Sequence, residues 1–427
     1  MNIEILRKTA PPVRPVENIN LTEPEFFMLD NGIPVYCLNA GDQEVLQLDL
    51  NFGFGTATDS LPLAAYFTNL CLKEGTKSYT SRQIAEQLDF YGATINASVT
   101  RDHSRLTLYC LNKHLDLLLP LLEELLLAPT FPLNEVKTIV NLSKQEFLVE
   151  MEKVKTLARR YFGMAIFGTS HPYGKYAVAE DFDKISHESL LEFYAEYYQS
   201  AKFRIIASGR IPLNLNRLLN KHLGQHAIKE TLSMAIGPAE PSSTKHHFIK
   251  KSGSLQSGIA IGKTLFNLHH PDYSKMKIVN TIFGGYFGSR LMTNIREDKG
   301  YTYGINSVLM SMQHAGMLMI ATQTGTEVTR PAVNEIFTEM ERLRHEPVPR
   351  EELDLVKNYM LGLLLKQADG PFAQGELLKM VLDYQLDLSY FQKFINTIKS
   401  VTTEEIQDLA VKYLDPNSMI SVVVGQE

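Results

Sequence analysis

The amino-acid sequence predicts an α+β protein built from two homologous domains, each a mostly antiparallel sheet with helices packed on one face. Three observations support this fold class. The chain is long, it contains an internal repeat, and each half combines strand-like and helix-like segments. Its 427 residues exceed what a single hydrophobic core usually organises. The sequence therefore favours two domains over one.

The internal repeat is clearest at the end of each half, where an amphipathic helix is followed by an apolar strand. The helix begins at Ile185 in the first half and at Val401 in the second, and the strand begins at Phe203 and at Met419. Both pairs are 216 residues apart. In each copy a Ser or Thr precedes a first turn that contains glutamate, which is the pattern of an N-terminal helix cap.

A second match supports the same duplication. The segment that begins at Phe131 resembles the one that begins at Val348, at an offset of 217 residues. Between the halves, residues 236–244 are rich in Pro, Ser and Thr, a composition typical of linkers. We therefore expect an N-terminal domain of residues 1–230 and a C-terminal domain of residues 231–427.

The first half contains several segments with strand-like patterning. A turn signal at Asp30–Gly32 precedes an apolar run, and Val45–Phe54 alternates apolar and polar side chains, as a half-buried strand does. Two further short runs, Ile95–Val99 and Arg105–Cys110, are typical of an antiparallel pair joined around Asp102. Long helices after these strands would cover one face of the sheet.

Composition and charge exclude several classes of protein. Hydrophobic residues make up 44% and charged residues 21% of the chain, as in a soluble globular protein, and the net charge of -6 gives no general bias toward nucleic acid. The most apolar stretch, 115–129, is interrupted by charges and proline, so we expect no membrane-spanning helix. The first residues show no signal-peptide core, and the three cysteines are expected as buried free thiols. We therefore expect a cytoplasmic protein without nucleic-acid or membrane partners.

Two segments carry the functional information. The first, Leu63–Thr76, has the form of a helix that ends shortly before Gly-Thr. The second, Phe283–Ser307, contains a Gly-Gly turn, Ser-Arg-Leu, then Arg-Glu-Asp-Lys-Gly and the start of a strand. Both resemble the insulinase-like metallopeptidases of family M16, and the resemblance extends over almost the whole chain. His171–Gly174 also matches a loop common in that family, and we interpret it as structural.

In the family, the helix that corresponds to Leu63–Thr76 carries His-x-x-Glu-His. Its two histidines hold zinc, and its glutamate acts as general base. The resemblance places Tyr66, Asn69 and Leu70 at those three positions. A phenol, an amide and an isobutyl group can neither bind zinc in this way nor act as the general base. Glu146, 76 residues after Leu70, falls where the family has its third zinc ligand, but one carboxylate does not make a catalytic zinc site. We therefore expect Glu146 to be a surface charge on a helix, and no metal bound by this chain.

The second segment retains its functional pair. In the family, the residues that correspond to Arg296 and Tyr303 lie across the cleft from the zinc and contact the scissile carbonyl or the adjacent backbone. A guanidinium and a phenol can both donate hydrogen bonds to a developing oxyanion. Without the surrounding motif, Arg296 would be interpreted as an ion-pair residue on a helix surface.

The resemblance also places Asn96 on a strand that lines the cleft, where an extended peptide adds to the edge of the sheet. Asn96 is therefore either a contact to a peptide or a residue that fixes the end of its strand.

A chain with the arginine and tyrosine but without the zinc ligands resembles the non-zinc partner of paired M16 peptidases. The resemblance implies a chain that is inactive alone and part of a metalloendopeptidase heterodimer. A zinc-bearing M16 subunit would complete the site, and a peptide would be the substrate. No cofactor is expected in this chain, and zinc is expected in the partner. The alternative is a peptide-binding or scaffold protein of the same fold with no role in hydrolysis.

Overall fold

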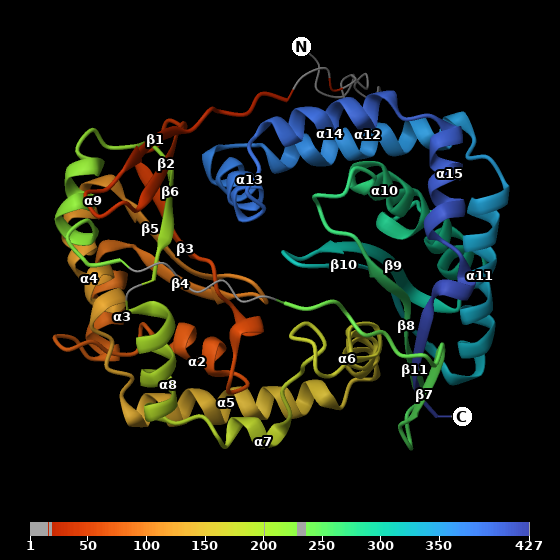
Figure 1. Cartoon of the computed structure of the whole chain (residues 1–427), viewed down its shortest axis with the longest axis horizontal. Helices are drawn as coiled ribbons and strands as arrows, with labels where there is room; N and C mark the ends of the chain where they lie inside the picture. Colours follow the sequence, from red (N-terminus) through yellow and green to blue (C-terminus); the bar gives the residue numbers. More distant parts are fainter. Residues whose placement is uncertain (1–15, 17–18, 200, 229–235, 427) are drawn as a thin grey trace, which may run out of the picture.

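The computed structural model describes residues 16, 19–199, 201–228 and 236–426. Two β-sheets lie in two halves of the molecule, and helices surround them on the outside (Figure 1). The first sheet is formed by strands of the first half of the chain and the second sheet by strands of the second half.

The first sheet has six strands in the order β1-β2-β6-β3-β5-β4. All neighbours are antiparallel except β2 and β6, which run parallel. The patterns at 45–54, 95–99 and 105–110 predicted three of these strands to within about two residues at each end. The strands are β1 (Glu25–Met28), β2 (Pro34–Asn39), β3 (Val45–Phe52), β4 (Thr94–Val99), β5 (Ser104–Leu111) and β6 (Phe203–Gly209).

The second sheet repeats this arrangement with five strands in the order β7-β11-β8-β10-β9. Its only parallel pair is β7 and β11, which occupy the positions of β2 and β6 in the first sheet. Among the described residues, the strand β1 has no counterpart in the second sheet. The strands are β7 (His246–Lys250), β8 (Gln256–Leu265), β9 (Thr302–Ser311), β10 (Gly316–Gly325) and β11 (Ile420–Gly425).

The shared strand order confirms the predicted fold class of two related α+β halves with mostly antiparallel sheets. The helix caps expected at the repeat are also present. Ser186 accepts a hydrogen bond from the Ser189 amide, and Thr402 accepts one from the Glu405 amide. The predicted domain boundary, between residues 230 and 231, lies outside the described residues and stays a prediction.

Helices form the outer layer of each half, and their apolar faces meet the sheets in two main cores. The first half contains α2 (Ala64–Cys71), α3 (Ser81–Tyr91), α4 (Leu115–Leu127), α5 (Leu133–Met151), α6 (Val154–Phe167), α7 (Ala179–Phe182), α8 (His187–Phe193) and α9 (Leu215–Leu223). The second half contains α10 (Tyr273–Asn280), α11 (Thr329–His345), α12 (Arg350–Gln367), α13 (Pro371–Asp383), α14 (Ser389–Ser400) and α15 (Thr403–Tyr413). No described helix is both long and apolar enough to cross a membrane.

The two halves exchange one helix each. Helix α6 of the first half packs on β8 and β11 of the second sheet, and α13 of the second half packs on β6 and β2 of the first. Close approach of α6 is possible because Gly258 has no side chain. A Cβ there would lie 2.3 Å from the Val154 carbonyl oxygen. The exchanged helices add cover to the sheet faces opposite the main helical layer, a feature that the sequence pattern did not reveal.

The interface between α13 and the first sheet contains buried charges. Lys379 Nζ lies 3.1 Å from Asp49 Oδ1, and the Asp49 carboxylate also accepts hydrogen bonds from Gln47 and Thr107. At the C-terminal end of the helix, Asp383 pairs with Arg105 of β5. The exchanged helix is therefore fixed by specific polar pairs as well as by apolar packing.

The segment between the halves is held against α6. The amides of Glu240 and Ser242 donate hydrogen bonds to carbonyl oxygens at the end of that helix. His171 of the loop after α6 makes a ring hydrogen bond to the Gly237 carbonyl oxygen, at 3.1 Å. Segment 236–244, which has the composition of a linker, therefore follows a defined path in the structure.

Candidate functional site

The three positions of the degenerate zinc motif lie on the short helix α2, but they face different environments. Tyr66 is 39% exposed and packs edge-on against the ring of Phe67. Leu70 is partly buried. Asn69, in contrast, is 1% exposed and points into the protein. These side chains therefore do not present one polar face to a common ligand.

Asn69 has a structural role in this position. Its amide nitrogen donates to the Tyr198 hydroxyl at 2.9 Å and to the Arg105 carbonyl oxygen at 3.3 Å. Burial raises the pKa of the Tyr198 phenol to about 12, so this hydroxyl stays protonated near neutral pH. Asn69 thus ties α2 to strand β5 and to the π-helical segment Tyr194–Tyr198.

The residues at the family's zinc site do not fit a zinc ion. Glu146 lies on the exposed face of α5. Catalytic zinc sites use about three nitrogen, oxygen or sulfur ligands from the protein. Among the described residues, no group of three or more His, Cys, Asp or Glu side chains is placed to hold a metal ion. The amide of Asn69 already has two partners, and Leu70 has no donor atom.

Asn96 lies on β4, the outermost strand of the first sheet. It is opposite Thr107 of β5 and its side chain is exposed. In the described part of the chain β4 pairs with β5 alone, so its other backbone edge is unpaired there and could accept an added strand. The position is thus compatible with the contact that the family resemblance implies.

Arg296 and Tyr303 lie on adjoining elements of the second half. Arg296 belongs to the π-helical segment Met292–Asp298, and Tyr303 lies near the start of the edge strand β9. The two elements pack together, and the Tyr301 amide donates to the Ile295 carbonyl oxygen at 3.0 Å. Single turns of π-helix occur frequently at functional sites.

Local backbone structure turns Tyr303 outward. The pairing of β9 with β10 is irregular at this point, because the register shifts between Thr322 and Thr324. The hydroxyl groups of Thr302 and Thr322 both donate to the Gly304 carbonyl oxygen and fix the irregularity. As a result, the Tyr303 side chain is 96% exposed. Bulges of this kind commonly re-aim a side chain beside an active site.

The Arg296 guanidinium rests on an aromatic ring. It lies 4.6 Å from the ring centroid of Phe287, which is itself 64% exposed. The neighbouring Arg290 is different, because two hydrogen bonds of 2.9 Å join it to the carboxylate of Glu352. Within the described residues no acidic side chain forms an ion pair with Arg296, so its donors remain open to a ligand.

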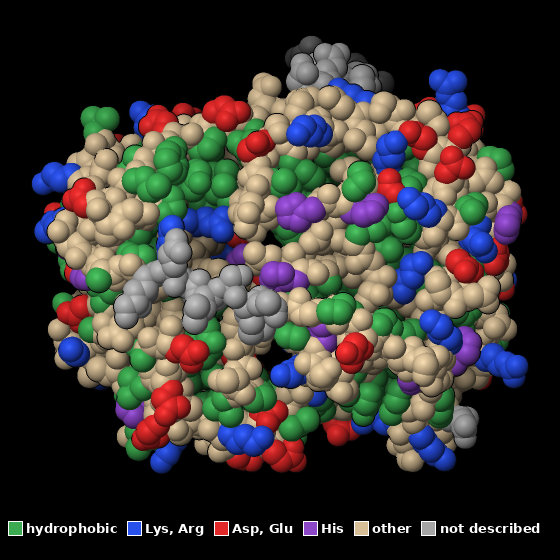
Figure 2. Space-filling view, viewed as in Figure 1, with side chains coloured by type: hydrophobic (Ala, Val, Ile, Leu, Met, Phe, Trp, Pro, Cys, Tyr) green, Lys and Arg blue, Asp and Glu red, His purple; other side chains and the backbone are tan. Residues whose placement is uncertain are grey.

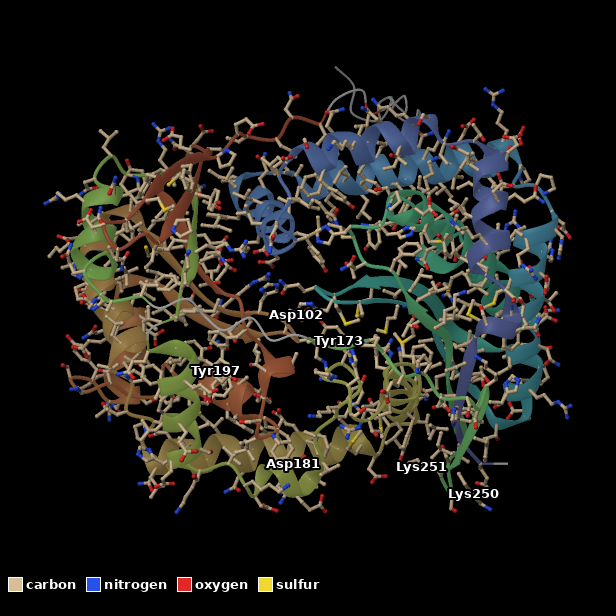
Figure 3. The ribbon with its side chains drawn as sticks, in the orientation of Figure 1. Asp102, Tyr173, Asp181, Tyr197, Lys250 and Lys251 are labelled. Carbon is tan, nitrogen blue, oxygen red and sulfur yellow. The ribbon has the colours of Figure 1, made fainter. Side chains whose placement is uncertain are left out.

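The structure also joins two turns that the sequence did not connect. Asp102, between β4 and β5, accepts a hydrogen bond from the Gln313 amide in the turn between β9 and β10, at 3.0 Å. The Tyr173 hydroxyl donates to the same carboxylate at 2.5 Å and accepts from the His314 amide. Asp102 and Tyr173 lie together in the middle of the molecule (Figure 3). Sequence reasoning singled out the Asp102 turn and the loop His171–Gly174, but not the turn at Gln313, and no local signal showed that the three meet.

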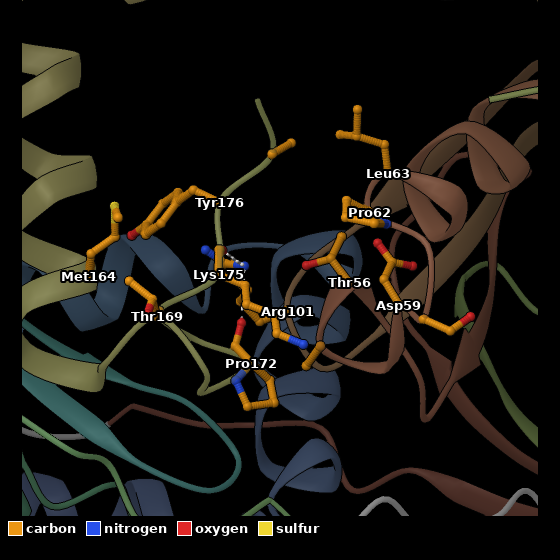
Figure 4. Close-up of a pocket in the computed structure, with 14 residues that line it drawn as sticks. Thr56, Asp59, Pro62, Leu63, Arg101, Met164, Thr169, Pro172, Lys175 and Tyr176 are labelled. Atoms are coloured by element: carbon orange, nitrogen blue, oxygen red, sulfur yellow. Dashed lines mark hydrogen bonds between the residues drawn. The ribbon is translucent and has the colours of Figure 1, made fainter. Parts of the chain in front are cut away.

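A further feature that the sequence did not indicate is a cavity of about 350 Å³ beside the N-terminal end of α2. The walls come from the segment before α2, the turn at Arg101 and the loop after α6 (Figure 4). Asp59 and Arg101 contribute opposite charges to these walls. None of Tyr66, Asn69, Leu70, Asn96, Arg296 and Tyr303 lines it.

Charge on the visible surface is mixed. Lys and Arg side chains are interspersed with Asp and Glu over most of the face shown in Figure 2. This distribution agrees with the small net charge of -6 and lacks the basic stripe typical of nucleic-acid binding on that face.

Comparison with known proteins agrees with the resemblance over most of the chain. Residues 41–167 match the family described as "Insulinase (Peptidase family M16)", and residues 184–360 match "Peptidase M16 inactive domain". A Bacillus subtilis protein named "Uncharacterized zinc protease YmxG" is 22% identical over 90% of this chain and 94% of its own length. A Helicobacter pylori protein named "Non-peptidase homolog YmxG" is 23% identical over 88% of this chain and 87% of its own.

Solved structures show the same fold. A protein from Pseudomonas fluorescens, described as a peptidase M16 inactive domain, superposes with a TM-score of 0.83 at 24% identity, covering 95% of this chain and 98% of that one. A structure described as a protease from Helicobacter pylori gives a TM-score of 0.84 at 17% identity, covering 95% and 100%. The chain therefore belongs to peptidase family M16, as a homologue that resembles the inactive members and lacks the zinc motif.

Proposed function

We propose that this chain is the zinc-less subunit of a heterodimeric M16 peptidase and that it supplies Arg296 and Tyr303 to a composite peptide-hydrolysing site. In this proposal the chain is inactive alone. A zinc-bearing M16 subunit is its partner, and a peptide is the substrate. We place the complex in the cytoplasm, which the three buried unpaired cysteines Cys37, Cys71 and Cys110 support.

The observation that carries the proposal is that one motif holds an exposed phenol and a half-buried guanidinium that pairs with no described carboxylate. Tyr303 is 96% exposed, and Arg296 is held on the exposed ring of Phe287 instead of in an ion pair with a described carboxylate. Arg290, six residues earlier, shows how the same motif looks when an arginine is structural, because Glu352 binds it with two hydrogen bonds. An exposed donor on a bulged edge strand, beside a half-buried guanidinium without a described acidic partner, is typical of a ligand site.

These two groups can stabilise negative charge on a peptide carbonyl. A guanidinium presents several N–H donors in a fixed plane, and a phenol presents one O–H donor. Either group can donate to the carbonyl oxygen of a bound peptide and donate more strongly as that oxygen becomes an oxyanion. This role needs no metal on the present chain, so it is compatible with a degenerate α2.

The need for a zinc-bearing partner follows from the absence of zinc ligands at the motif positions of this chain. Tyr66, Asn69, Leu70 and Glu146 do not fit a zinc ion, so a nucleophilic water for peptide cleavage would have to be activated elsewhere. Names given to relatives are consistent with this division. One homologue from Helicobacter pylori is called a non-peptidase homolog, and one from Bacillus subtilis a probable inactive metalloprotease.

The test is co-expression with a zinc-bearing M16 subunit of the same genome, followed by a peptidase assay on a mixed peptide library. We expect activity only when both chains are present. Arg296→Ala and Tyr303→Phe should each lower turnover by about 10²–10³, the usual effect of removing one oxyanion donor. The loss should appear in kcat if the contact strengthens in the transition state, and in KM if it only holds the peptide.

The controls separate catalysis from assembly. Both variants should fold and form the heterodimer, because Tyr303 is exposed and Arg296 makes no described ion pair. Lys250→Gln on the exposed edge of β7 should leave turnover unchanged. Full activity of the double variant Arg296→Ala/Tyr303→Phe would instead identify the chain as a scaffold or peptide-binding subunit.

A further inference from the structure

The cavity beside α2 is built by three segments that are far apart in the sequence. The segment 56–63 forms one wall, Arg101 forms the floor between β4 and β5, and residues 164–177 form the opposite wall (Figure 4). Backbone hydrogen bonds from Thr56 to Thr100 and from Ala57 to Arg101 join the first two segments, at 2.9 and 2.8 Å. The cavity of about 350 Å³ is within the size range of small-molecule sites.

Arg101 is fixed in place but keeps part of its donor capacity. One terminal nitrogen donates to the carbonyl oxygens of Lys175 and Pro172, at 3.0 and 3.4 Å. The guanidinium also lies 4.9 Å from the ring centroid of Tyr176. These contacts orient the cation at the floor of the cavity, while the exposed Lys175 side chain adds a second positive charge at its mouth.

Asp59 supplies the negative charge on the opposite wall. One carboxylate oxygen accepts a hydrogen bond from the Ala65 amide at 2.8 Å, which anchors the start of α2. No ion pair between Asp59 and Arg101 is present in the described part of the chain, although both line the same cavity. The cavity thus contains a carboxyl group and a guanidinium that are not in direct contact with each other.

The remaining walls are apolar. Met164 and the Tyr176 ring lie on one side, and Pro62 and Leu63 lie near Asp59 on the other. Leu63 adopts a left-handed backbone conformation with φ of 73°, which is unusual for a residue with a side chain. This strain at a cavity wall is typical of a functional position rather than of a simple helix start.

We propose that this cavity binds a small zwitterion, a short peptide or a free amino acid, with its ammonium group at Asp59 and its carboxylate at Arg101 and Lys175. The apolar walls would receive an aliphatic side chain. A multivalent anion is disfavoured because the Asp59 carboxylate would repel it. A metal ion is disfavoured because the cavity offers one carboxylate beside two positively charged side chains. A molecule that carries both charges satisfies both walls at once. This site is separate from Arg296 and Tyr303, and the proposal concerns the isolated chain.

The charge state of Asp59 gives the site a pH dependence. Burial raises the pKa of this carboxyl to about 7, and the hydrogen bonds from the α2 backbone and the positive charge of Arg101 act in the opposite direction. The phenols of Tyr176 and Tyr197 and the ammonium group of Lys175 are further titratable groups around it. An ammonium group binds the ionised carboxylate, so affinity should rise as the pH increases through about 7.

The test is isothermal titration calorimetry of the full chain with the tripeptide Leu-Gly-Gly, its N-acetylated form and its C-terminal amide. Asp59→Asn keeps an acceptor for the Ala65 amide but removes the charge. It should lower the affinity for Leu-Gly-Gly by about tenfold or more, the scale of a charge-assisted hydrogen bond, but should not lower the affinity for the N-acetylated peptide. Lys175→Gln should lower the affinity for Leu-Gly-Gly more than the affinity for its C-terminal amide. Lys250→Gln, on β7 and not among the residues that line the cavity, is the matched control and should bind as the wild type does.

A pH comparison adds an independent readout. In the wild type, affinity for Leu-Gly-Gly should be about tenfold lower at about pH 5.5 than at about pH 7.5, and Asp59→Asn should remove the difference. Circular dichroism at both pH values would confirm that each variant is folded. Equal affinity for the parent and N-acetylated peptides, or no binding of Leu-Gly-Gly at millimolar concentration, would overturn the proposal.

Discussion

At the scale of single residues, the degenerate zinc motif on α2 contributes structural contacts instead of metal ligands. Asn69 stands where a general base would be expected, and its amide instead connects α2 to Tyr198 and β5. Arg296 and Tyr303 show the opposite pattern. Tyr303 is exposed, and Arg296 is half-buried on the Phe287 ring without a described ion pair. The contrast between a motif position used in structural contacts and two donors without an acidic partner supports the proposed division of labour.

The sequence could predict the identity of these residues but not all of their surroundings. Arg296 and Tyr303 lie in a continuous motif, so spacing was enough to select them. The Asp59 cavity could not be predicted, because its walls come from segments more than a hundred residues apart and its acid is a single aspartate before a helix. Local patterns do not record which distant loop closes over such a residue.

Asp59 also leads to a prediction about stability. Burial raises its pKa in the folded protein from 3.8 to about 7. A carboxyl whose pKa is raised on folding contributes stability that is fully present below its unfolded pKa and is lost as the pH rises through the folded pKa. Asp59→Asn should therefore flatten the decline of Tm between about pH 5 and about pH 8.

The measurement is thermal unfolding of the wild type and Asp59→Asn at both pH values. At about pH 8 the variant should be the more stable protein, because it does not bury a charge. A steeper decline of Tm in the variant than in the wild type would contradict the raised pKa.

At the scale of elements, helix α13 illustrates why periodicity alone does not determine packing. It contains Lys379, which is 3% exposed in the structure. A helix expected to cover its own sheet would not bury a lysine without a partner. The explanation is Asp49 of the first sheet, which the chain places more than three hundred residues away and which is 0% exposed.

This pair predicts a large effect on stability. Lys379→Met should lower the free energy of unfolding by about 3–5 kcal/mol, because it leaves the buried Asp49 carboxylate without its cation. Adding Asp49→Asn should recover part of the loss, since the remaining groups are then neutral. Urea unfolding measures both values.

A matched control is Lys366→Met on the exposed surface of α12, which should change stability by about 0.5 kcal/mol or less. Equal, small effects of the two lysine substitutions would show that the contact between α13 and the first sheet is weak. Loss of stability in Lys379→Met without any recovery in the double variant would assign the effect to packing instead of charge.

At the scale of the whole molecule, the exchange of α6 and α13 makes each half depend on the other. The two sheets share their strand order, and the sequence repeat was sufficient to predict two similar sheets. The exchange was not predictable, because a buried apolar helix such as α6 looks the same whichever sheet covers it. Contact partners far apart in the chain are set by tertiary structure, not by periodicity.

The exchange predicts that the two halves unfold together. Helix α6 buries Phe162 and Ile166 in a core with Ala260 and Val422 of the second sheet, so removal of a first-half side chain should destabilise second-half strands. Phe162→Ala should lower the free energy of unfolding by about 3–5 kcal/mol. Calorimetry should show one transition for the wild type and for the variant. Amide hydrogen exchange should become faster in β8 and β11 as well as in α6. Two separate transitions, or faster exchange confined to the first half, would mean that the sheets are independent units and that the exchanged helices dock only weakly.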